Sequence, residues 1–177
     1  MGLEDLEELR ERMRTQRPVS WGELPDLSLY MDQVVGYMPR QLIRYGGEEA
    51  LTPAMVNNYI KDGLLPRAEG KRYSRDHLAY LTAICALKQV LPVRDAGLLA
   101  APREGADVRE TYETFRSELD RAMTAAADEV EGEDLAQLAL SLALRSYADK
   151  LACQRVLELL RRSRPEPEKR FHKKEKR

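Results

Sequence analysis

The sequence predicts an all-α fold with a small β-wing, and three observations support this. Apolar residues recur at three- and four-residue steps over most of the 177 residues, as in amphipathic helices. Prolines and glycines divide these stretches into separate segments. One segment, residues 64–74 (LLPRAEGKRYS), lacks helical spacing and carries a proline, a glycine and a basic tip, which indicates a β-hairpin or wing.

Composition narrows the class of protein. With 43% hydrophobic and 33% charged residues, the chain is too apolar to be wholly disordered and too charged to be embedded in a membrane. No apolar run approaches the ~20 residues that a spanning helix needs. The first 17 residues are acidic and amphipathic, unlike a signal peptide. We therefore expect a cytoplasmic protein with no membrane partner.

Two helices are predicted before residue 50. Residues 3–16 carry leucines at helical spacing, and Pro18 ends this amphipathic arm. A first core helix is expected over residues 27–40, with Asp26 or Ser28 as its N-cap. Its apolar face would consist of Leu27, Tyr30, Met31, Val34, Val35 and Met38.

A third helix is predicted over residues 52–62. Thr52 is a favoured N-cap, Pro53 occupies the first helical position, and Gly63 is a natural stop. Helical spacing divides its residues between two faces. The buried stripe would hold Met55, Val56, Tyr59, Ile60 and, past the stop, Leu64, and the opposite face Ala54, Asn57, Asn58 and Lys61.

Further helices follow the expected wing. Ser74 caps a long helix that Pro92 closes, with a core face of Tyr80, Leu81, Ile84, Leu87 and Leu91, and a short helix follows to Pro102. Residues 107–130 and 133–162 are predicted as two more helices. The expected organisation is an amphipathic arm (1–19), a central domain (20–102), a helical oligomerisation or regulatory domain (103–163) and a basic, disordered tail (164–177).

The charge distribution and the outward face of helix 52–62 favour binding of double-stranded DNA. The chain has a net charge of −1, yet Lys61–Arg75 is locally basic. Asparagine amides can pair with adenine in the major groove, and basic side chains neutralise phosphates. We expect the helix to read bases and the wing, residues 66–73, to bind the backbone. The candidate DNA-binding residues are Thr52, Ala54, Asn57, Asn58, Lys61, Arg67, Lys71, Arg72, Tyr73 and Arg75.

No catalytic or metal-binding pattern is present in the sequence. Cys85 and Cys153 lie inside apolar helical patterns, which favours buried, reduced thiols, and the two histidines do not complete a zinc ligand set. Trp21 is expected to pack the arm onto the central domain. We therefore expect neither an enzyme, nor a cofactor, nor a metal site.

The order of these segments resembles the MerR family of bacterial regulators. MVNNYIKDGLLPRAEGKRYSRDHLAYLTAICALKQVLPVRDAGLL (55–99) is similar to that family's recognition helix, wing, next helix and short following helix. Together with WGELPDLSLYMDQV (21–34), it resembles more closely a bacterial family described as a domain of unknown function, which is predicted to share the MerR-like fold. The chain has Asn57, Asn58 and Tyr59 where MerR proteins have an arginine and paired tyrosines, so individual contacts do not transfer.

The resemblance implies a winged helix-turn-helix domain, a role in transcription regulation and a homodimer on a palindromic site, since one short helix reads few base pairs. It leaves room for a small-molecule effector but identifies none. Residues 3–13 and 135–160 offer candidate interface faces. The alternative is a protein-interaction adaptor that keeps the helix-turn-helix fold and binds a partner through its acidic helices.

Overall fold

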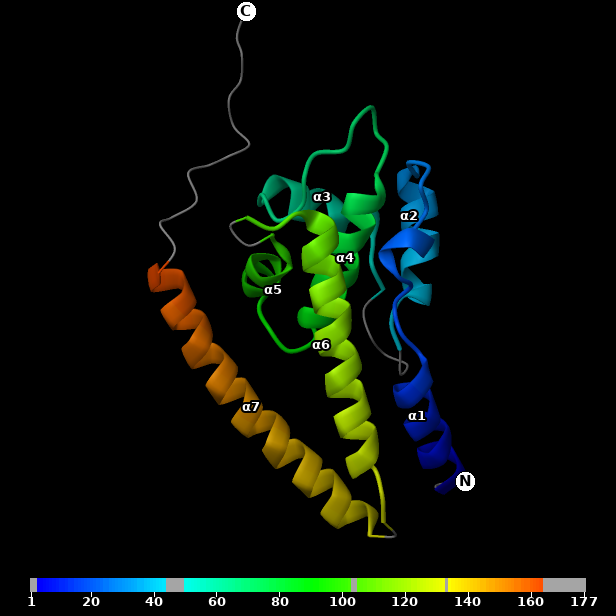
Figure 1. Ribbon diagram of the computed structural model, residues 1–177, viewed down its shortest axis with the longest axis vertical. Coiled ribbons are helices and arrows are strands. Elements are labelled where there is room, and N and C mark those ends of the chain that lie inside the picture. The colour runs from blue at the N-terminus through cyan, green and yellow to red at the C-terminus, as the bar shows by residue number, and fades with distance from the viewer. Residues whose placement is uncertain (1–2, 44–49, 103–104, 133, 164–177) are drawn as a thin grey trace, which may run out of the picture. The chain divides into compact units, whose positions relative to one another are not determined.

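The computed structural model describes residues 3–43, 50–102, 105–132 and 134–163. The chain forms two compact units, the first ending at Glu129 and the second beginning at Val130. The first holds α1 (Leu3–Thr15), α2 (Met31–Tyr37), α3 (Pro53–Lys61), α4 (Arg75–Leu87), α5 (Val93–Ala100) and α6 (Val108–Glu129), with 3-10 turns at Trp21–Glu23 and Met38–Arg40; the second holds α7 (Leu135–Ser163) (Figure 1). The expected disordered tail lies outside the described residues.

The expected β-wing is wrong, because the described residues contain no β-strand. Residues 66–73 form a loop with two isolated bridges, one inside it between Glu69 and Arg72 and one from Tyr73 to Leu29. The backbone N–H groups just before the loop already have partners and cannot pair with a second strand. Both Leu64 and Leu65 donate their N–H to the carbonyl of Tyr59, at 2.8 and 3.2 Å, and Pro66 has no N–H. The fold is therefore helical without a wing.

The predicted signals for α3 are confirmed. The Thr52 hydroxyl accepts a hydrogen bond from the Met55 N–H at 3.2 Å, and Pro53 is the first helical residue. Gly63 adopts a φ of 73°, the left-handed conformation that ends many helices. Ser74 likewise caps α4, as expected.

The helix expected over residues 27–40 is shorter than predicted. It begins at Met31, and Met38–Arg40 continues as a 3-10 turn. Leu29 instead forms a bridge with Tyr73, with backbone N–H to O distances of 2.9 and 2.8 Å. Two residues expected in the core are consequently exposed: Leu27 retains 77% of its accessible surface and Tyr30 48%. Neither Asp26 nor Ser28 is the cap, which is Tyr30.

The core of the first unit is built around α4. Leu78, Leu81 and Ile84 are completely buried in one cluster with Val34 of α2 and Val56 of α3. Helices α5 and α6 pack against the same helix (Figure 1). Cys85 and Cys153 are not joined in a disulfide and are half-buried, rather than fully buried as expected. No helix in the described residues has the length and apolarity to cross a membrane.

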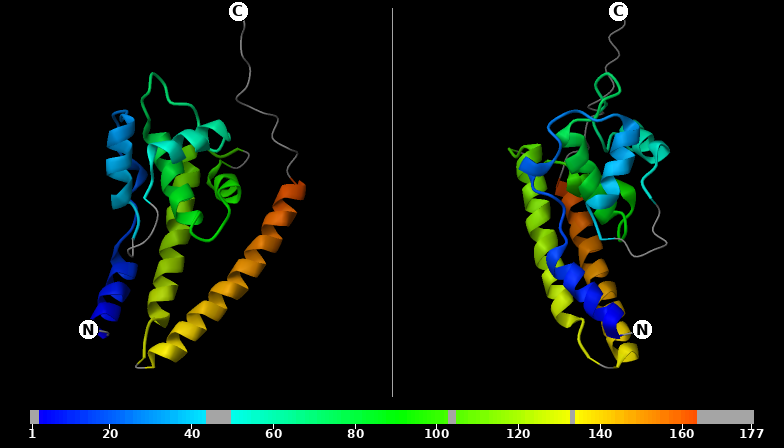
Figure 2. Two further views of the ribbon diagram at one scale, coloured as in Figure 1. Left: turned by 180° about the vertical axis from the view of Figure 1, so that it is seen from behind. Right: turned by 90° about the vertical axis from the view of Figure 1, so that its right-hand side faces the viewer.

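The amphipathic arm packs along α6, as both views in Figure 2 show. Arg17 and Asp120 form an ion pair at 2.6 Å, and Arg14 and Asp128 form another at 2.7 Å. The acidic residues of α6, which the sequence suggested as a partner-binding face, therefore compensate arginines of the same chain. Helix α6 is part of the first unit, whereas a domain boundary near residue 103 was expected.

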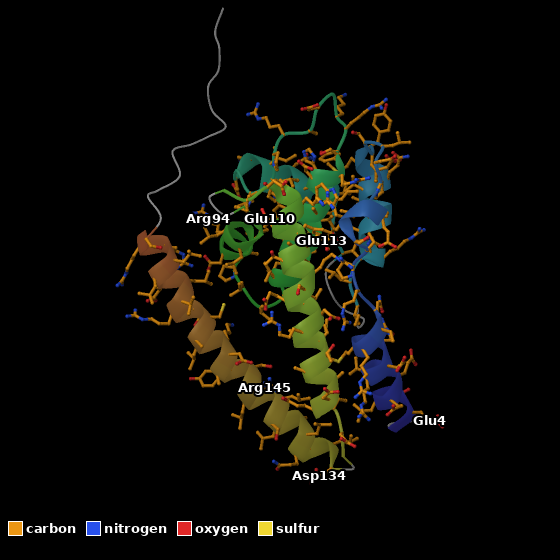
Figure 3. The ribbon with its side chains drawn as sticks, in the orientation of Figure 1. Glu4, Arg94, Glu110, Glu113, Asp134 and Arg145 are labelled. Atoms are coloured by element: carbon orange, nitrogen blue, oxygen red, sulfur yellow. The ribbon has the colours of Figure 1, made fainter. Side chains whose placement is uncertain are left out.

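The segment after α1 is attached to α6 by polar contacts. The Trp21 ring packs against Tyr112 with 6.2 Å between ring centroids, and the backbone N–H of Trp21 donates to the Glu113 carboxylate at 2.7 Å. Figure 3 labels Glu113 on α6. The Tyr112 hydroxyl donates to the carbonyl of Val19 at 2.8 Å. Trp21 thus packs the arm onto the domain, as expected.

We predict that Gly97→Ala destabilises the protein by about 1–3 kcal/mol, the usual cost of overpacking a core. A Cβ at Gly97 of α5 would lie 2.6 Å from Leu64 Cδ2, and 3.2 Å from Leu64 Cβ and Cγ, so the short helix or Leu64 must shift. The free energy of unfolding in urea measures the effect.

Gly36 in α2 provides the matched control. A Cβ there has nothing within 4 Å, so Gly36→Ala should stabilise the protein by about 0.5–1 kcal/mol through lower backbone entropy of the unfolded chain. Equal effects of the two substitutions would contradict the close approach of α5 to Leu64.

Candidate nucleic-acid interface

The outward face of α3 is exposed as predicted. Ala54, Asn57, Asn58 and Lys61 are all exposed, whereas Val56 and Tyr59 are buried. The other residues of the predicted buried stripe, namely Met55, Ile60 and Leu64, are half-buried and pack against the core. The two side-chain amides are therefore available to a ligand, and each carries both donors and an acceptor.

The loop 66–73, here called the basic loop, turns tightly at Gly70 and Lys71. Their φ angles are 55° and 64°, and the backbone N–H of Arg72 donates to the Glu69 carbonyl at 2.9 Å. Positive φ at both central residues is characteristic of a type I′ turn. The turn leaves Arg67, Lys71 and Arg72 exposed.

Arg72 is held by Tyr30 from the segment before α2. Its guanidinium donates to the Tyr30 hydroxyl at 3.0 Å and lies 5.0 Å from the centre of the ring. The sequence prediction placed Tyr30 in the core and so missed this contact. The alternation of Leu27, Ser28 and Leu29, typical of extended chain, was the available signal. The basic loop is consequently attached to α2 by a side chain as well as by the Leu29–Tyr73 bridge.

Three of the predicted site residues have structural roles. Tyr73 is 5% exposed and belongs to the core, so it does not contribute to the surface. Arg75 is half-buried, with its guanidinium 5.8 Å from the centre of the Trp21 ring. The Thr52 hydroxyl caps α3. Thr52 is itself exposed. The other exposed candidates are Ala54, Asn57, Asn58, Lys61, Arg67, Lys71 and Arg72.

The face of α3 and the basic loop lie at the same end of the first unit, opposite α1 (Figures 1 and 2). Residues 61–73 carry four basic and two acidic side chains, and the acidic ones are Asp62 and Glu69. Since exposed charges interact mainly within about 8–10 Å, this local excess of positive charge matters more to an approaching anion than the net charge of the chain.

His77 of α4 contacts the last residue of the basic loop and the residue that follows it. Its ring packs edge-on against Tyr73, with 5.4 Å between centroids, and its Nδ1 accepts the N–H of Ser74 at 3.0 Å. Burial of the ring lowers the pKa of His77 below its ordinary value of 6.5, although backbone groups of Arg67 and Pro66 oppose the shift. The histidine is thus neutral at pH 7, with Nδ1 unprotonated.

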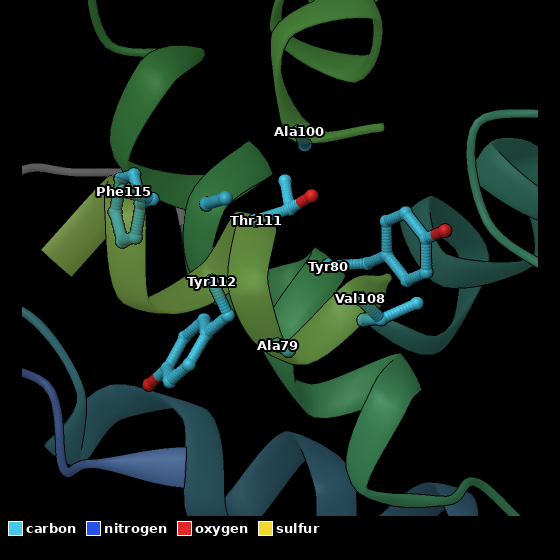
Figure 4. A pocket seen from close by; sticks show the side chains of 8 residues that line it. Ala79, Tyr80, Ala100, Val108, Thr111, Tyr112 and Phe115 are labelled. Atoms are coloured by element: carbon cyan, nitrogen blue, oxygen red, sulfur yellow. The ribbon is translucent and has the colours of Figure 1, made fainter. Parts of the chain in front are cut away.

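A cavity between α4, α5 and α6 does not extend the site. Side chains from these helices line it, among them Tyr80, Thr111 and Phe115 (Figure 4). Its volume is about 10 Å³, roughly the space that one water molecule requires. This cavity therefore has no room for a small-molecule effector.

Comparison with known families identifies the central part of the chain. Residues 19–115 match the family described as Domain of unknown function (DUF1836), which is more than half of the chain. The chain belongs to the DUF1836 family. Within this DUF1836 region lie α2, α3, the basic loop, α4 and α5, so the family match includes the whole candidate interface. Helices α1 and α7 lie outside it.

The other comparisons add no functional information. No curated protein and no solved structure matches the chain. The resemblance to a domain of unknown function is therefore confirmed, whereas nothing in these comparisons links the DUF1836 chain to MerR-like regulators.

The lowered pKa of His77 predicts that stability falls as the pH decreases through about 6.5. The unfolded chain then binds a proton at this histidine, whereas the folded chain resists it because the ring is buried; protonation of Nδ1 would also break the bond from Ser74. His77→Gln retains an acceptor at the third helical position, as in a capping box, and should show a weaker pH dependence. Urea unfolding between pH 7.5 and 5.5 measures it.

A His172→Gln variant is the control for the second histidine of the chain. If His77→Gln loses stability with decreasing pH as steeply as the wild type, burial of His77 is not the cause.

Proposed function

We propose that this DUF1836 protein is a sequence-specific regulator that binds double-stranded DNA, with α3 in the major groove and the basic loop on the phosphate backbone. The observation that carries the proposal is the exposed pair of amides, Asn57 and Asn58, on a helix whose far face is buried and whose next segment is a basic turn. The proposal places the protein in the bacterial cytoplasm, where such regulators act.

The amides supply the sequence preference in this proposal. An asparagine side chain can donate to N7 of adenine and accept from its N6 amino group, so that one amide makes two hydrogen bonds to one base. Asn57 and Asn58 are adjacent on the exposed face of α3, with the small Ala54 before them and Lys61 after them. A small residue allows close approach of the helix to base edges.

The basic loop supplies affinity that is independent of sequence. Each phosphate neutralised by a lysine or arginine releases counterions, so that binding weakens as salt increases. Arg72 is positioned by the Tyr30 hydroxyl and ring, which lowers the entropy lost when its guanidinium contacts a phosphate. The fixed turn at Gly70 and Lys71 presents a second cation beside it.

The proposed DNA-binding domain is a MerR-like helix-turn-helix without a wing. The element order α2, α3, basic loop, α4 and α5 supports this part of the proposal.

The proposal is tested by selecting bound fragments from a genomic or random duplex pool and measuring their affinity at increasing salt. We expect a selected motif and a steep loss of affinity between 50 and 200 mM salt, as several phosphate contacts produce. Failure to retain any duplex at low salt would overturn the proposal and favour the protein-interaction adaptor.

Asn58→Ala is expected to relax sequence preference. Loss of a bidentate amide should cost ~1–3 kcal/mol at one base position of the selected motif and change binding to unrelated duplexes little. Asn58 is exposed, so the fold should be retained. Equilibrium titrations with the selected motif and its single-base variants measure the loss.

Lys71→Ala is expected to weaken binding to all duplexes alike and to reduce the slope of log K against log salt by about 1. Arg121→Ala on α6 is the matched control, because it removes an exposed cation from a helix outside the candidate surface. Parallel losses for Asn58→Ala and Lys71→Ala on every sequence would contradict the division of roles between helix and loop.

A further inference from the structure

Helix α7 carries an apolar stripe that the described residues of its own unit leave exposed. Leu140, Leu144, Tyr147 and Leu151 retain 53%, 58%, 61% and 49% of their accessible surface. Their spacing of four, three and four residues places them on one side of the helix, and it is the spacing of a coiled-coil seam. α7 is the one helix in the described part of the second unit, so no other helix of that part packs against the stripe.

The spacing of the residues in the stripe is the same when counted from either end of the helix. Gln137 lies three residues before Leu140, and Gln154 lies three residues after Leu151, so the seam runs in steps of three, four, three, four and three. The pattern is symmetric about the bond between Arg145 and Ser146. A two-fold axis at that point would place apolar residues opposite apolar residues, with Leu140 facing Leu151, Leu144 facing Tyr147 and glutamine facing glutamine at the ends.

The charges beside the seam select an antiparallel arrangement. Asp134 and Arg155 occupy the same flanking position of the seven-residue repeat, at opposite ends of α7, and both are exposed (Asp134 is labelled in Figure 3). Antiparallel helices bring an aspartate of one copy beside an arginine of the other, twice. In a parallel pair this flanking position lies on opposite sides of the seam in the two helices, so Asp134 would not meet an arginine of the other copy.

The groups concerned also have contacts within the chain that fit this arrangement. An oxygen of Asp134 accepts the N–H of Gln137 at 3.0 Å, which caps α7, and Arg155 pairs with Glu158 at 2.7 Å. A carboxylate accepts several hydrogen bonds and a guanidinium donates five, so each group can take a further partner. Ala143 and Ala148 flank the centre of the seam and allow close approach.

We propose that α7 is a dimerisation helix that pairs antiparallel with the α7 of a second copy of this chain. Leu140 packs against the partner's Leu151, Leu144 packs against the partner's Tyr147, and Asp134 lies beside the partner's Arg155. The inference is independent of DNA binding and concerns a part of the chain outside the family match.

The first experiment measures the mass of the full chain by sedimentation equilibrium at micromolar concentrations. We expect a dimer for the wild type and a monomer for the double variant Leu144→Lys/Tyr147→Lys. Both side chains are exposed, so helicity by circular dichroism should be unchanged. Ser146→Lys, also exposed but off the seam, is the control and should stay dimeric. A monomeric wild type, or a double variant that remains a dimer, would overturn the proposal.

The second experiment determines the orientation of the helices. Gln137→Cys and Gln154→Cys are made separately in a Cys85→Ala/Cys153→Ala background, mixed in equal amounts, re-equilibrated and treated with a short bis-maleimide. An antiparallel dimer yields the 137–154 cross-link between the two variants. Cross-links within each variant alone, of 137 to 137 or 154 to 154, would show a parallel dimer and overturn the pairing.

Discussion

The backbone pairing of Leu29 with Tyr73 is the interaction on which the candidate surface depends. It joins the segment before α2 to the end of the basic loop, and the buried Tyr73 ring is fixed in turn against His77 of α4. At the other end of the loop, the N–H groups of Leu64 and Leu65 are bound to the last turn of α3. Both ends of the loop are thus anchored, and its cations keep a defined position beside the face of α3.

The sequence was sufficient where structure depends on near neighbours. Thr52, Gly63 and Ser74 mark helix ends because a cap needs a side chain or a backbone conformation within three residues of the terminus. Helical periodicity also divided α3 correctly into an exposed face with Asn57 and Asn58 and a buried one. These local rules were enough to define the polar helix of the candidate site.

The sequence was insufficient where partners lie far along the chain. The bridge between residues 29 and 73 draws Leu29 out of the expected helix and leaves Tyr30 exposed against Arg72. The alternation over residues 27–29 indicates extended chain but does not identify its distant partner. Tyr73 follows a basic tip and so was interpreted as a contact residue, yet its ring fills the core. The expected wing has no strands because the N–H groups of Leu64 and Leu65 before the loop are engaged by α3, and after the turn Tyr73 pairs with Leu29 instead of with the first half of the loop.

Because ion pairs join α1 to α6, the segment that matches the DUF1836 family does not coincide with the compact folding unit. The DUF1836 match spans residues 19–115, whereas the compact unit extends to Glu129 and includes the arm. A fragment that begins at residue 19 and keeps the whole of α6 leaves Asp120 and Asp128 without their arginine partners. That fragment would carry two uncompensated carboxylates on α6, which repel an anion that comes within about 8–10 Å of them. Boundaries drawn from residue 1 to about 129 avoid this artefact.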